Sequence, residues 1–252
     1  MTKGFYQLTS SMLSQGRRLD VVGNNMTNLS TPGYKAETYT DRTFQEVLIS
    51  RVGNKDKSGA TVIGQESYIL APDQLYVNYA QGTIKETGLT LDFAIQGDGF
   101  FAIQTDNGVE YTRSGSFSLD GEGRLCLAGH GTVLGTDGQP ITLYTDQITA
   151  DSAGRIYTKD GTYQGQLGVY TFGDNAQLSK GVSGLFQAGG QQAQLQTQPQ
   201  LSWKCVEESN VDMLQEMSRM LTAQRSLQSS AQVLKLYDGV LTKATTDLGR
   251  LM

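Results

Sequence analysis

Apolar residues recur at helical spacing along the last part of the chain. Steps of four and three from Met213 pass through mostly apolar positions, the heptad pattern of a long amphipathic helix. No proline interrupts this segment, and Ser209 or Asn210 ahead of Asp212 is expected to cap the first turn. The sequence therefore predicts a helix within residues 209–252. Its seam positions are Met213, Met217, Met220, Gln224, Leu227, Ala231, Leu234, Asp238, Leu241, Thr245 and Leu248.

A second seam of the same kind lies at the other end of the chain. The predicted helix runs from about Lys3 to Asn28 and ends before Pro32-Gly33, which suits a type II turn because glycine accepts a positive φ at the third position. A helix of about 40 residues is about 60 Å long, more than a body of this size can cover. The two seams are therefore expected to pair. The N-terminal seam comprises Phe5, Leu8, Met12, Gln15, Leu19, Val22, Met26 and Leu29.

Three asparagines cluster in the last turns of the predicted N-terminal helix, at Asn24, Asn25 and Asn28. Asparagine is an indifferent helix former, so its presence there needs a reason. One interpretation is local bonding between side chain and backbone near the helix end. The other is a polar contact with a neighbouring element. The sequence favours neither.

Between the two helical segments the pattern changes to short β runs. Residues 34–90 are interpreted as an extended connector with short strands at 68–70, 75–79 and 83–85 and an exposed loop at Gly53–Gly59. Residues 91–188 are predicted to form an all-β domain, and 189–208 a return connector. The predicted β runs are 93–95, 100–103, 111–112, 116–119, 124–127, 132–134, 141–144, 155–157 and 167–170. Between them stand Asp98-Gly99, Asn107-Gly108, Asp120-Gly121, Asp137-Gly138 and Asp160-Gly161, which favour type I′ hairpin turns.

The predicted fold class is therefore α+β. Residues 1–33 and 209–252 would form a pair of long coiled-coil-like helices, and the extended connector would lead to an all-β domain inserted between them.

Composition narrows the range of functions. A net charge of −5 and the lack of a basic face argue against nucleic-acid binding. No run of 18 apolar residues is present, so membrane insertion is not expected. The N-terminus lacks a charged region followed by an apolar core, so no cleaved secretory signal is expected. Cys126 and Cys205 suggest two thiols rather than a disulfide framework or metal site.

Catalytic motifs are weak, and the chain is not expected to be an enzyme. Gly97–Ala102 formally fits G-x-G-x-x-A, but Phe100 continues as a strand where a dinucleotide site needs a helix. His130, the single histidine, lies in a glycine-rich turn, and a catalytic relay through it is less favoured than an exposed loop residue. Asp120 and Glu122 lie in a turn where solvation is the default. No catalytic residue, metal site or cofactor is predicted.

A second, non-enzymatic hypothesis is a β-rich adhesion or glycan-binding module on a helical stalk. Tyr157, Tyr163, Tyr170 and Phe172 could form a sugar-binding platform, although residues at strand spacing are more often core or cross-strand pairs. A stalk would normally be one continuous segment. Seams at both ends of the chain favour a subunit of an assembly instead.

Three segments resemble the flagellar rod and hook proteins. Residues 23–35 (GNNMTNLSTPGYK) resemble the family's N-terminal signature. Residues 91–101 (LDFAIQGDGFF) with 111–117 (YTRSGSF) resemble its central domain. Residues 208–212 (ESNVD) with 223–226 (AQRS) resemble its C-terminal block. The three motifs stand in the family's order and span nearly the whole chain. Gly23, Thr27 and the Ser226-Leu227 pair depart from the common pattern, which weakens an assignment to one rod segment.

The resemblance implies a structural subunit of the bacterial flagellar basal-body rod. Such subunits leave the cell through the flagellar type III export apparatus and assemble with copies of themselves and with other rod and hook subunits into a hollow helical tube. The chain length and the Gly129–Gly135 turn resemble the proximal and distal rod proteins more than the longer hook protein, although a hook-type or other axial protein is the alternative. The expected assembly residues are Phe5, Leu8, Met12, Leu19, Val22, Asn24, Asn25, Met26, Leu29, Pro32, Gly33, Asn210, Met213, Met217, Met220, Leu227, Leu234, Leu241 and Leu248.

Overall fold

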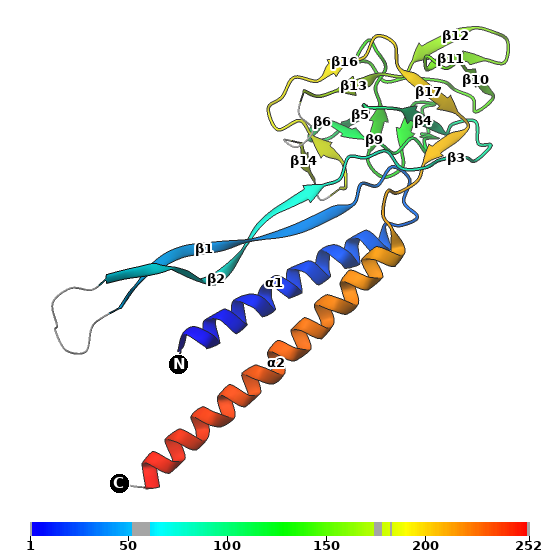
Figure 1. Cartoon of the computed structure of the whole chain (residues 1–252). Coiled ribbons are helices and arrows are strands. Elements are labelled where there is room, and N and C mark those ends of the chain that lie inside the picture. The colour runs from blue at the N-terminus through cyan, green and yellow to red at the C-terminus, as the bar shows by residue number, and fades with distance from the viewer. Residues whose placement is uncertain (1, 52–60, 174–177, 182, 251–252) are drawn as a thin grey trace. The chain divides into compact units, whose positions relative to one another are not determined.

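The chain folds into two compact units in a computed structural model, which describes residues 2–51, 61–173, 178–181 and 183–250 (Figure 1). The helical unit contains Met1–Met26, Glu37–Tyr76 and Asp212–Met252. The β unit contains Thr27–Ala36 and Val77–Val211. The chain therefore passes from one unit to the other four times.

The helical unit holds both long helices, α1 at Thr2–Thr27 and α2 at Met213–Arg250. The helix bounds follow the predicted ones closely, but the predicted cap of α2 is wrong. Asp212 caps α2, because its Oδ1 accepts hydrogen bonds from Leu214 N at 2.9 Å and Gln215 N at 3.2 Å. Within the described helices, neither carries a stretch apolar enough to cross a membrane.

The predicted coiled-coil-like pairing of the two helices is wrong, although the chain is α+β. The α2 seam residues Met213 and Met217 remain 53% and 48% exposed, where an interlocked seam would bury them. Among the described side chains of α2, the buried ones are Glu216 and Ala223, on a different heptad position. Glu216 is buried because Asn25 of α1 donates to it at 3.3 Å. The face of α2 that meets α1 therefore carries a polar contact, which apolar periodicity cannot reveal.

The extended connector with short strands is also corrected. Its first part is a long two-stranded ribbon, β1 at Glu37–Arg51 and β2 at Thr61–Val77, whose arrows run in opposite directions in Figure 1. The Thr40 hydroxyl donates to Gln74 O at 3.1 Å across the ribbon. The exposed loop expected at 53–59 lies outside the described residues. A half-buried strand is recognised by strict alternation of apolar and polar residues, and β1 and β2 lack it. The strands predicted from the sequence were therefore too short.

The β unit consists of short strands that all pair antiparallel where the structure gives their register. Its largest sheet has the order β14-β15-β6-β5-β9-β8-β7, with β13 also paired to β5 and β16. Separate sheets are β10-β11-β12, β17-β4 and β18-β3. The strands are β3 Ile84–Glu86, β4 Phe93–Gln96, β5 Phe100–Thr105, β6 Gly108–Thr112, β7 Ser118–Leu119, β8 Leu125–Leu127, β9 Gly131–Val133, β10 Ile148–Ala150, β11 Arg155–Thr158, β12 Tyr163–Gln166, β13 Val169–Thr171, β14 Ser179–Lys180, β15 Phe186–Gln187, β16 Gln194–Leu195, β17 Gln200–Trp203 and β18 Cys205–Glu207.

Strand β5 is buried on both faces and divides the core of the β unit in two. Phe101 and Ile103 point into the main cluster, whereas Phe100 and Ala102 point into a second cluster around Phe186. Successive side chains of a strand face opposite sides, so an unbroken apolar run is what a doubly covered strand requires. Four consecutive apolar residues, Phe100 to Ile103, therefore mark the centre of the unit.

The Asp-Gly and Asn-Gly dipeptides lie at turns, but the predicted type I′ geometry is wrong. Among the described residues outside glycine, a positive φ occurs at Tyr144 and Lys204, so no Asp or Asn takes the left-handed conformation that type I′ demands. In the β5–β6 hairpin, Gly108 has a φ of 120°. Glycine alone supplies the unusual backbone angle there.

One predicted strand is absent. Residues 141–144 make an isolated bridge, Arg124 to Thr142, and no strand. The backbone turns away at Tyr144, whose φ is 56°, and Leu143 N and Tyr144 N both donate to Gly123 O. The apolar run reflects the burial of Ile141 and Leu143 and not a ladder.

Two turns of the sequence form D-x-x-G-R are built alike. In the first, Asp120 Oδ1 accepts from Glu122 N and Arg124 N, and Oδ2 accepts from Arg124 Nε at 2.8 Å. In the second, Asp151 accepts from Ala153 N and from Arg155 N and Nε in the same way. In each turn, both oxygens of the aspartate carboxylate thus accept hydrogen bonds that fix the backbone and the arginine.

We expect the first of these turns to respond to acid. The hydrogen bonds from the Arg124 side chain and backbone hold the pKa of Asp120 below its usual value. A carboxyl with a lowered folded pKa stabilises the protein above its unfolded pKa, and this contribution is lost as the pH falls through the folded one. Asp120→Asn should therefore lower the Tm slightly at neutral pH and have no effect at about pH 2. Thermal unfolding against pH, with the exposed Glu122→Gln as control, measures this.

Candidate assembly site

Three side chains form a buried ion cluster in the β unit: Lys35, Arg113 and Glu207. Lys35 and Glu207 are each 1% exposed and Arg113 is 3% exposed, and Lys35 Nζ lies 2.6 Å from Glu207 Oε1. Arg113 Nε lies 3.1 Å from Glu207 Oε2, which makes a second ion pair to the same carboxylate. Burial of charge without partners is costly, so the three groups depend on one another.

The cluster also binds the backbone of the segments around it. Lys35 Nζ donates to Ala80 O at 2.7 Å, and Gly82 N donates to Glu207 Oε1 at 2.9 Å. The Arg113 guanidinium donates to Gly97 O and Gly99 O, both at 2.6 Å. These are the glycines of the formal dinucleotide motif, and here they position a cation and not a phosphate.

Burial dominates the electrostatics of the two cations. It lowers the pKa of Lys35, and the hydrogen bond and charge of Glu207 oppose that shift. It also lowers the pKa of Arg113, again opposed by the charge of Glu207. Glu207 is therefore the carboxylate that pairs with both desolvated cations, and the charge of Asp98 adds to its effect.

Gly33 brings the chain from α1 against the β unit. It has a φ of 69° in a turn closed by Tyr34 N donating to Thr31 O at 3.3 Å, which confirms the type II turn predicted at Pro32-Gly33. Gly33 N also donates to Glu207 O at 2.7 Å. A Cβ at this position would overlap Ser114 N and Arg113 C, so only glycine permits this approach.

The side-chain amide of Asn210 binds the backbone of two other segments of the chain. Its Nδ2 donates to Asn78 O at 2.8 Å and Ala80 O at 2.9 Å, and its Oδ1 accepts from Ala36 N at 2.8 Å. Asn210, one of the two predicted helix caps, instead binds the residues before β1 and after β2. It thereby holds the segment that precedes α2 against both of them.

Asn25 has the corresponding role within the helical unit. It is fully buried, and its Nδ2 donates to Glu37 O at 2.8 Å while its Oδ1 accepts from Glu37 N at 2.9 Å. The same Nδ2 reaches Glu216 Oε2, and Glu216 Oε1 accepts from Arg219 at 2.7 Å. Of the two interpretations of the asparagine cluster, the polar contact with a neighbouring element describes Asn25.

The predicted assembly residues differ widely in exposure. Gly33 and Asn210 meet in the same junction, and Asn25 meets α2, but the seam leucines and methionines do not gather in one site. Buried are Val22, Asn25 and Gly33; partly buried are Leu8, Met12, Leu19, Met26, Leu29, Pro32, Asn210, Met220, Leu227 and Leu234; exposed are Phe5, Asn24, Met213, Met217 and Leu241. The side chain of Leu248 lies outside the described ones.

The sequence reasoning did not select the buried ion cluster. Lys35 and Glu207 are separated by 172 residues, and no local pattern pairs charges over such a distance. The one available signal was Glu207 inside the run Cys205-Val206-Glu207, a charge among residues that read as a strand.

The ranges that match known protein families coincide with these features. Residues 5–35 match the family described as flagella basal body rod protein, residues 94–157 the flagellar hook protein FlgE/F/G D1 domain, and residues 205–247 the flagellar basal body rod FlgEFG protein C-terminal. The ion cluster takes one member from each matched range: Lys35, Arg113 and Glu207.

Whole-chain relatives lead to the same family. The chain is 33% identical to the flagellar basal-body rod protein FlgG of Bacillus subtilis, covering 96% of this chain and 97% of that protein. The chain belongs to the flagellar basal-body rod protein family. It is also 30% identical to the flagellar hook-basal body complex protein FlhO of Bacillus subtilis, over the full length of both. With FlgF of Mesorhizobium japonicum it shares 31% identity over 99% of each chain. Nearly equal identities to FlgG and FlgF give the family and not the rod segment.

Membership in the rod family establishes where the protein is located and that its role is structural. It is a structural subunit of the rod in the flagellar basal body, and the family is structural and not enzymatic. Rod proteins assemble with other rod and hook subunits there. Within the two units, the buried ion cluster, Asn210 and Asn25 each join segments that lie far apart in the sequence.

Proposed function

We propose that this rod subunit polymerises with copies of itself and with other rod and hook subunits into a hollow helical tube that transmits torque from motor to hook. On this proposal motility requires it. A repeated contact between different surfaces of identical subunits, which does not close on itself, produces such a filament. The observation that carries the proposal is the exposed apolar surface of α2.

Helix α2 exposes large apolar side chains along its length. Leu236 is 71% exposed and Val240 is 61% exposed. A soluble helix normally buries such residues against its own protein, and contiguous apolar surface left exposed marks an interaction site. The exposed members are Met213, Leu214, Met217, Leu221, Val233, Leu236, Val240 and Leu241.

The apolar surface is hollowed in the C-terminal half of α2. A cleft of about 230 Å³ is lined by Val233, Leu236, Tyr237, Val240 and Leu241. Its walls contribute almost no polar groups, so an apolar side chain of another subunit is the occupant that fits. On this proposal the assembly residues predicted from the sequence lie between subunits, with α2 covered by adjoining copies.

A charge in this cleft should block assembly without unfolding the subunit. Leu236→Asp would place an unpaired carboxylate in a contact that becomes buried on polymerisation, which costs several kcal/mol. The concentration needed for polymerisation should rise by at least about tenfold, measured by sedimentation of polymer, and swimming should be lost. Because Leu236 is exposed in the subunit, its thermal unfolding should not change.

Gln232→Asp is the matched control, since it adds the same charge at an exposed polar position of the same helix. Leu227→Asp and Leu19→Asp should act like Leu236→Asp, because both positions belong to the predicted assembly surface. Polymerisation of Leu236→Asp at wild-type concentration would contradict the proposal.

We also infer that the terminal helices become fully ordered only on docking, and that the subunit leaves by the type III export apparatus without cleavage. Coupling order to assembly would favour growth at the tip over polymerisation in the cytoplasm. Hydrogen exchange on dilute monomer should show less protection in α2 than in β5. Equal protection of the two in a proven monomer would contradict the inference.

A further inference from the structure

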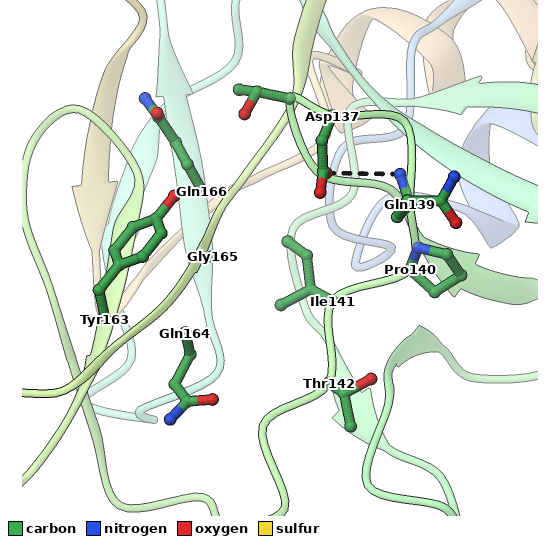
Figure 2. A pocket seen from close by; sticks show the side chains of 10 residues that line it. Asp137, Gln139, Pro140, Ile141, Thr142, Tyr163, Gln164, Gly165 and Gln166 are labelled. Carbon is green, nitrogen blue, oxygen red and sulfur yellow. Dashed lines mark hydrogen bonds between the residues drawn. The ribbon is translucent and has the colours of Figure 1, made fainter.

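A polar cleft of about 330 Å³ lies in the β unit between strand β12 and the loop of residues 136–142. Figure 2 shows the two walls facing one another, with Tyr163 and Gln166 on the strand and Asp137 and Ile141 on the loop. The volume is at the lower end of the range for small-ligand pockets, about 300–1,000 Å³. The assembly surface described above does not use these residues.

The cleft is formed before any ligand binds. Thr136 N donates to Gln166 O at 3.0 Å and ties the loop to the strand. Gln166 Nε2 donates to Ala153 O at 2.8 Å, which fixes that side chain from behind. Ile141, 4% exposed, closes the floor, and its side chain extends toward the strand (Figure 2). A braced cleft loses little conformational entropy when it is filled.

Tyr163 supplies an aromatic face to this cleft. It is 54% exposed, and its ring is held edge-on by Tyr157, its cross-strand partner, with centroids 5.9 Å apart. The other aromatics considered from the sequence lie elsewhere, because Tyr170 and Phe172 pack against the second core cluster. One aromatic, Tyr163, is thus both fixed in orientation and open to a ligand.

The polar groups around Tyr163 select a neutral ligand rich in hydroxyls. The lining holds one acidic side chain, Asp137, and no basic one. Phosphates and other anions are disfavoured because they need Arg or Lys partners. Amides such as Gln164 donate and accept, and a carboxylate accepts only, which together match hydroxyl groups that do both.

We propose that this cleft binds a neutral carbohydrate ring of a glycan chain, stacked on Tyr163 and hydrogen-bonded through its hydroxyls to Asp137 and Gln164. The site is independent of polymerisation and goes beyond the proposed function. Because Tyr163 leaves the cleft open to solvent, the cleft would accommodate one ring of a longer chain and not an enclosed monosaccharide. Affinity of about 1 mM per ring is expected for so shallow a contact.

Saturation-transfer NMR on the full chain tests this, with chitotetraose and cellotetraose as neutral probes and a heparin tetrasaccharide as the anionic one. Transfer to ring protons of at least one neutral probe is expected, and none to the anionic probe. Tyr163→Ala should weaken binding by about tenfold, the loss expected when one aromatic stacking face is removed. Asp137→Asn should weaken it less, because the amide still accepts a hydrogen bond.

Tyr144→Ala is the matched control, since Tyr144 is 80% exposed in the same unit and does not line the cleft. It should bind like wild type. Fluorescence of Trp203 and thermal unfolding establish that each variant is folded, and Tyr163→Leu replaces Tyr163→Ala if the latter is not. No transfer at about 10 mM sugar, unchanged binding by the folded Tyr163 variant, or equal loss in Tyr144→Ala would overturn the proposal.

A second arm identifies the source of the glycan. Co-sedimentation with purified insoluble cell-wall glycan, competed by the soluble probe and lost in Tyr163→Ala, would assign the site to the wall polymer. Transfer from soluble sugars without co-sedimentation would assign it to a soluble glycan. Leu236→Asp should bind sugar normally, so failure of this site is distinguishable from failure of the proposed assembly.

Discussion

Glu207→Gln should lower the free energy of unfolding of the β unit by about 3–5 kcal/mol, the cost of removing one partner from a buried ion pair. Gln keeps the size of the side chain and removes its charge. Lys35 and Arg113 would then remain as two buried cations that have lost the carboxylate paired with both, and the charge of Asp98 and their backbone hydrogen bonds would compensate their desolvation only in part. The change is therefore larger than the loss of one hydrogen bond would be.

Urea unfolding followed by tryptophan fluorescence measures this change. Trp203 is the single tryptophan of the chain and lies in β17, with its Nε1 donating to Thr90 O at 2.8 Å, so it reports on the β unit. Glu208→Gln is the control. Glu208 pairs with Lys85 at 3.1 Å, but both side chains are well exposed, so its loss should cost less than about 1 kcal/mol. Equal stability of the two variants would contradict a coupled cluster.

The pH dependence gives an independent signature. Burial lowers the pKa of Lys35 from its usual 10.5, and the removal of Glu207 takes away the group that opposes this shift. Where the folded pKa of a base lies below the unfolded one, the unfolded chain binds more protons, so stability rises with pH toward the unfolded pKa. The deficit of Glu207→Gln relative to Glu208→Gln should therefore shrink as the pH rises from neutral toward the unfolded pKa of 10.5. Arg113 keeps its charge throughout, so recovery should be partial.

The two helices and the β-rich middle could be predicted from the sequence because each depends on local periodicity. Heptad steps gave the extent of α1 and α2, and the apolar run of β5 marked the centre of the β unit. The pairing of the helices could not be predicted this way, because the buried face of α2 includes Glu216, which accepts a hydrogen bond from Asn25. A charged residue buried by a distant partner has no signature in its own segment.

In the candidate site, too, residues with a local sequence signature could be predicted, and residues that only the fold brings together could not. Gly33 could be found because proline and glycine together specify a turn, and that turn is present. The prediction that Ser209 or Asn210 caps α2 is wrong, because Asp212 caps the helix and Asn210 binds the backbone of two other segments. Lys35, Arg113 and Glu207 were missed as a cluster because each lies in a different part of the sequence, and only the fold brings them together.

Gly33→Ala should destabilise the β unit by on the order of 3 kcal/mol, because two penalties combine. The φ of 69° strains any residue with a Cβ, and the added methyl would overlap Ser114 N and Arg113 C. Backbone cannot yield as a flexible side chain can, so the turn must move away. That movement would also stretch the Gly33 N to Glu207 O hydrogen bond, now 2.7 Å, and loosen the residue that compensates Lys35 and Arg113.

Gly88→Ala separates the two penalties. Gly88 lies in the same unit with a φ of 76°, and nothing stands within 4 Å of a Cβ built there. It should therefore show the conformational cost alone, about 1–2 kcal/mol. Urea unfolding by Trp203 fluorescence should rank wild type above Gly88→Ala and Gly88→Ala above Gly33→Ala. Equal stability of the two alanine variants would contradict this prediction. It would mean that Gly33 is needed for its positive φ alone and not for its close approach to Ser114 and Arg113.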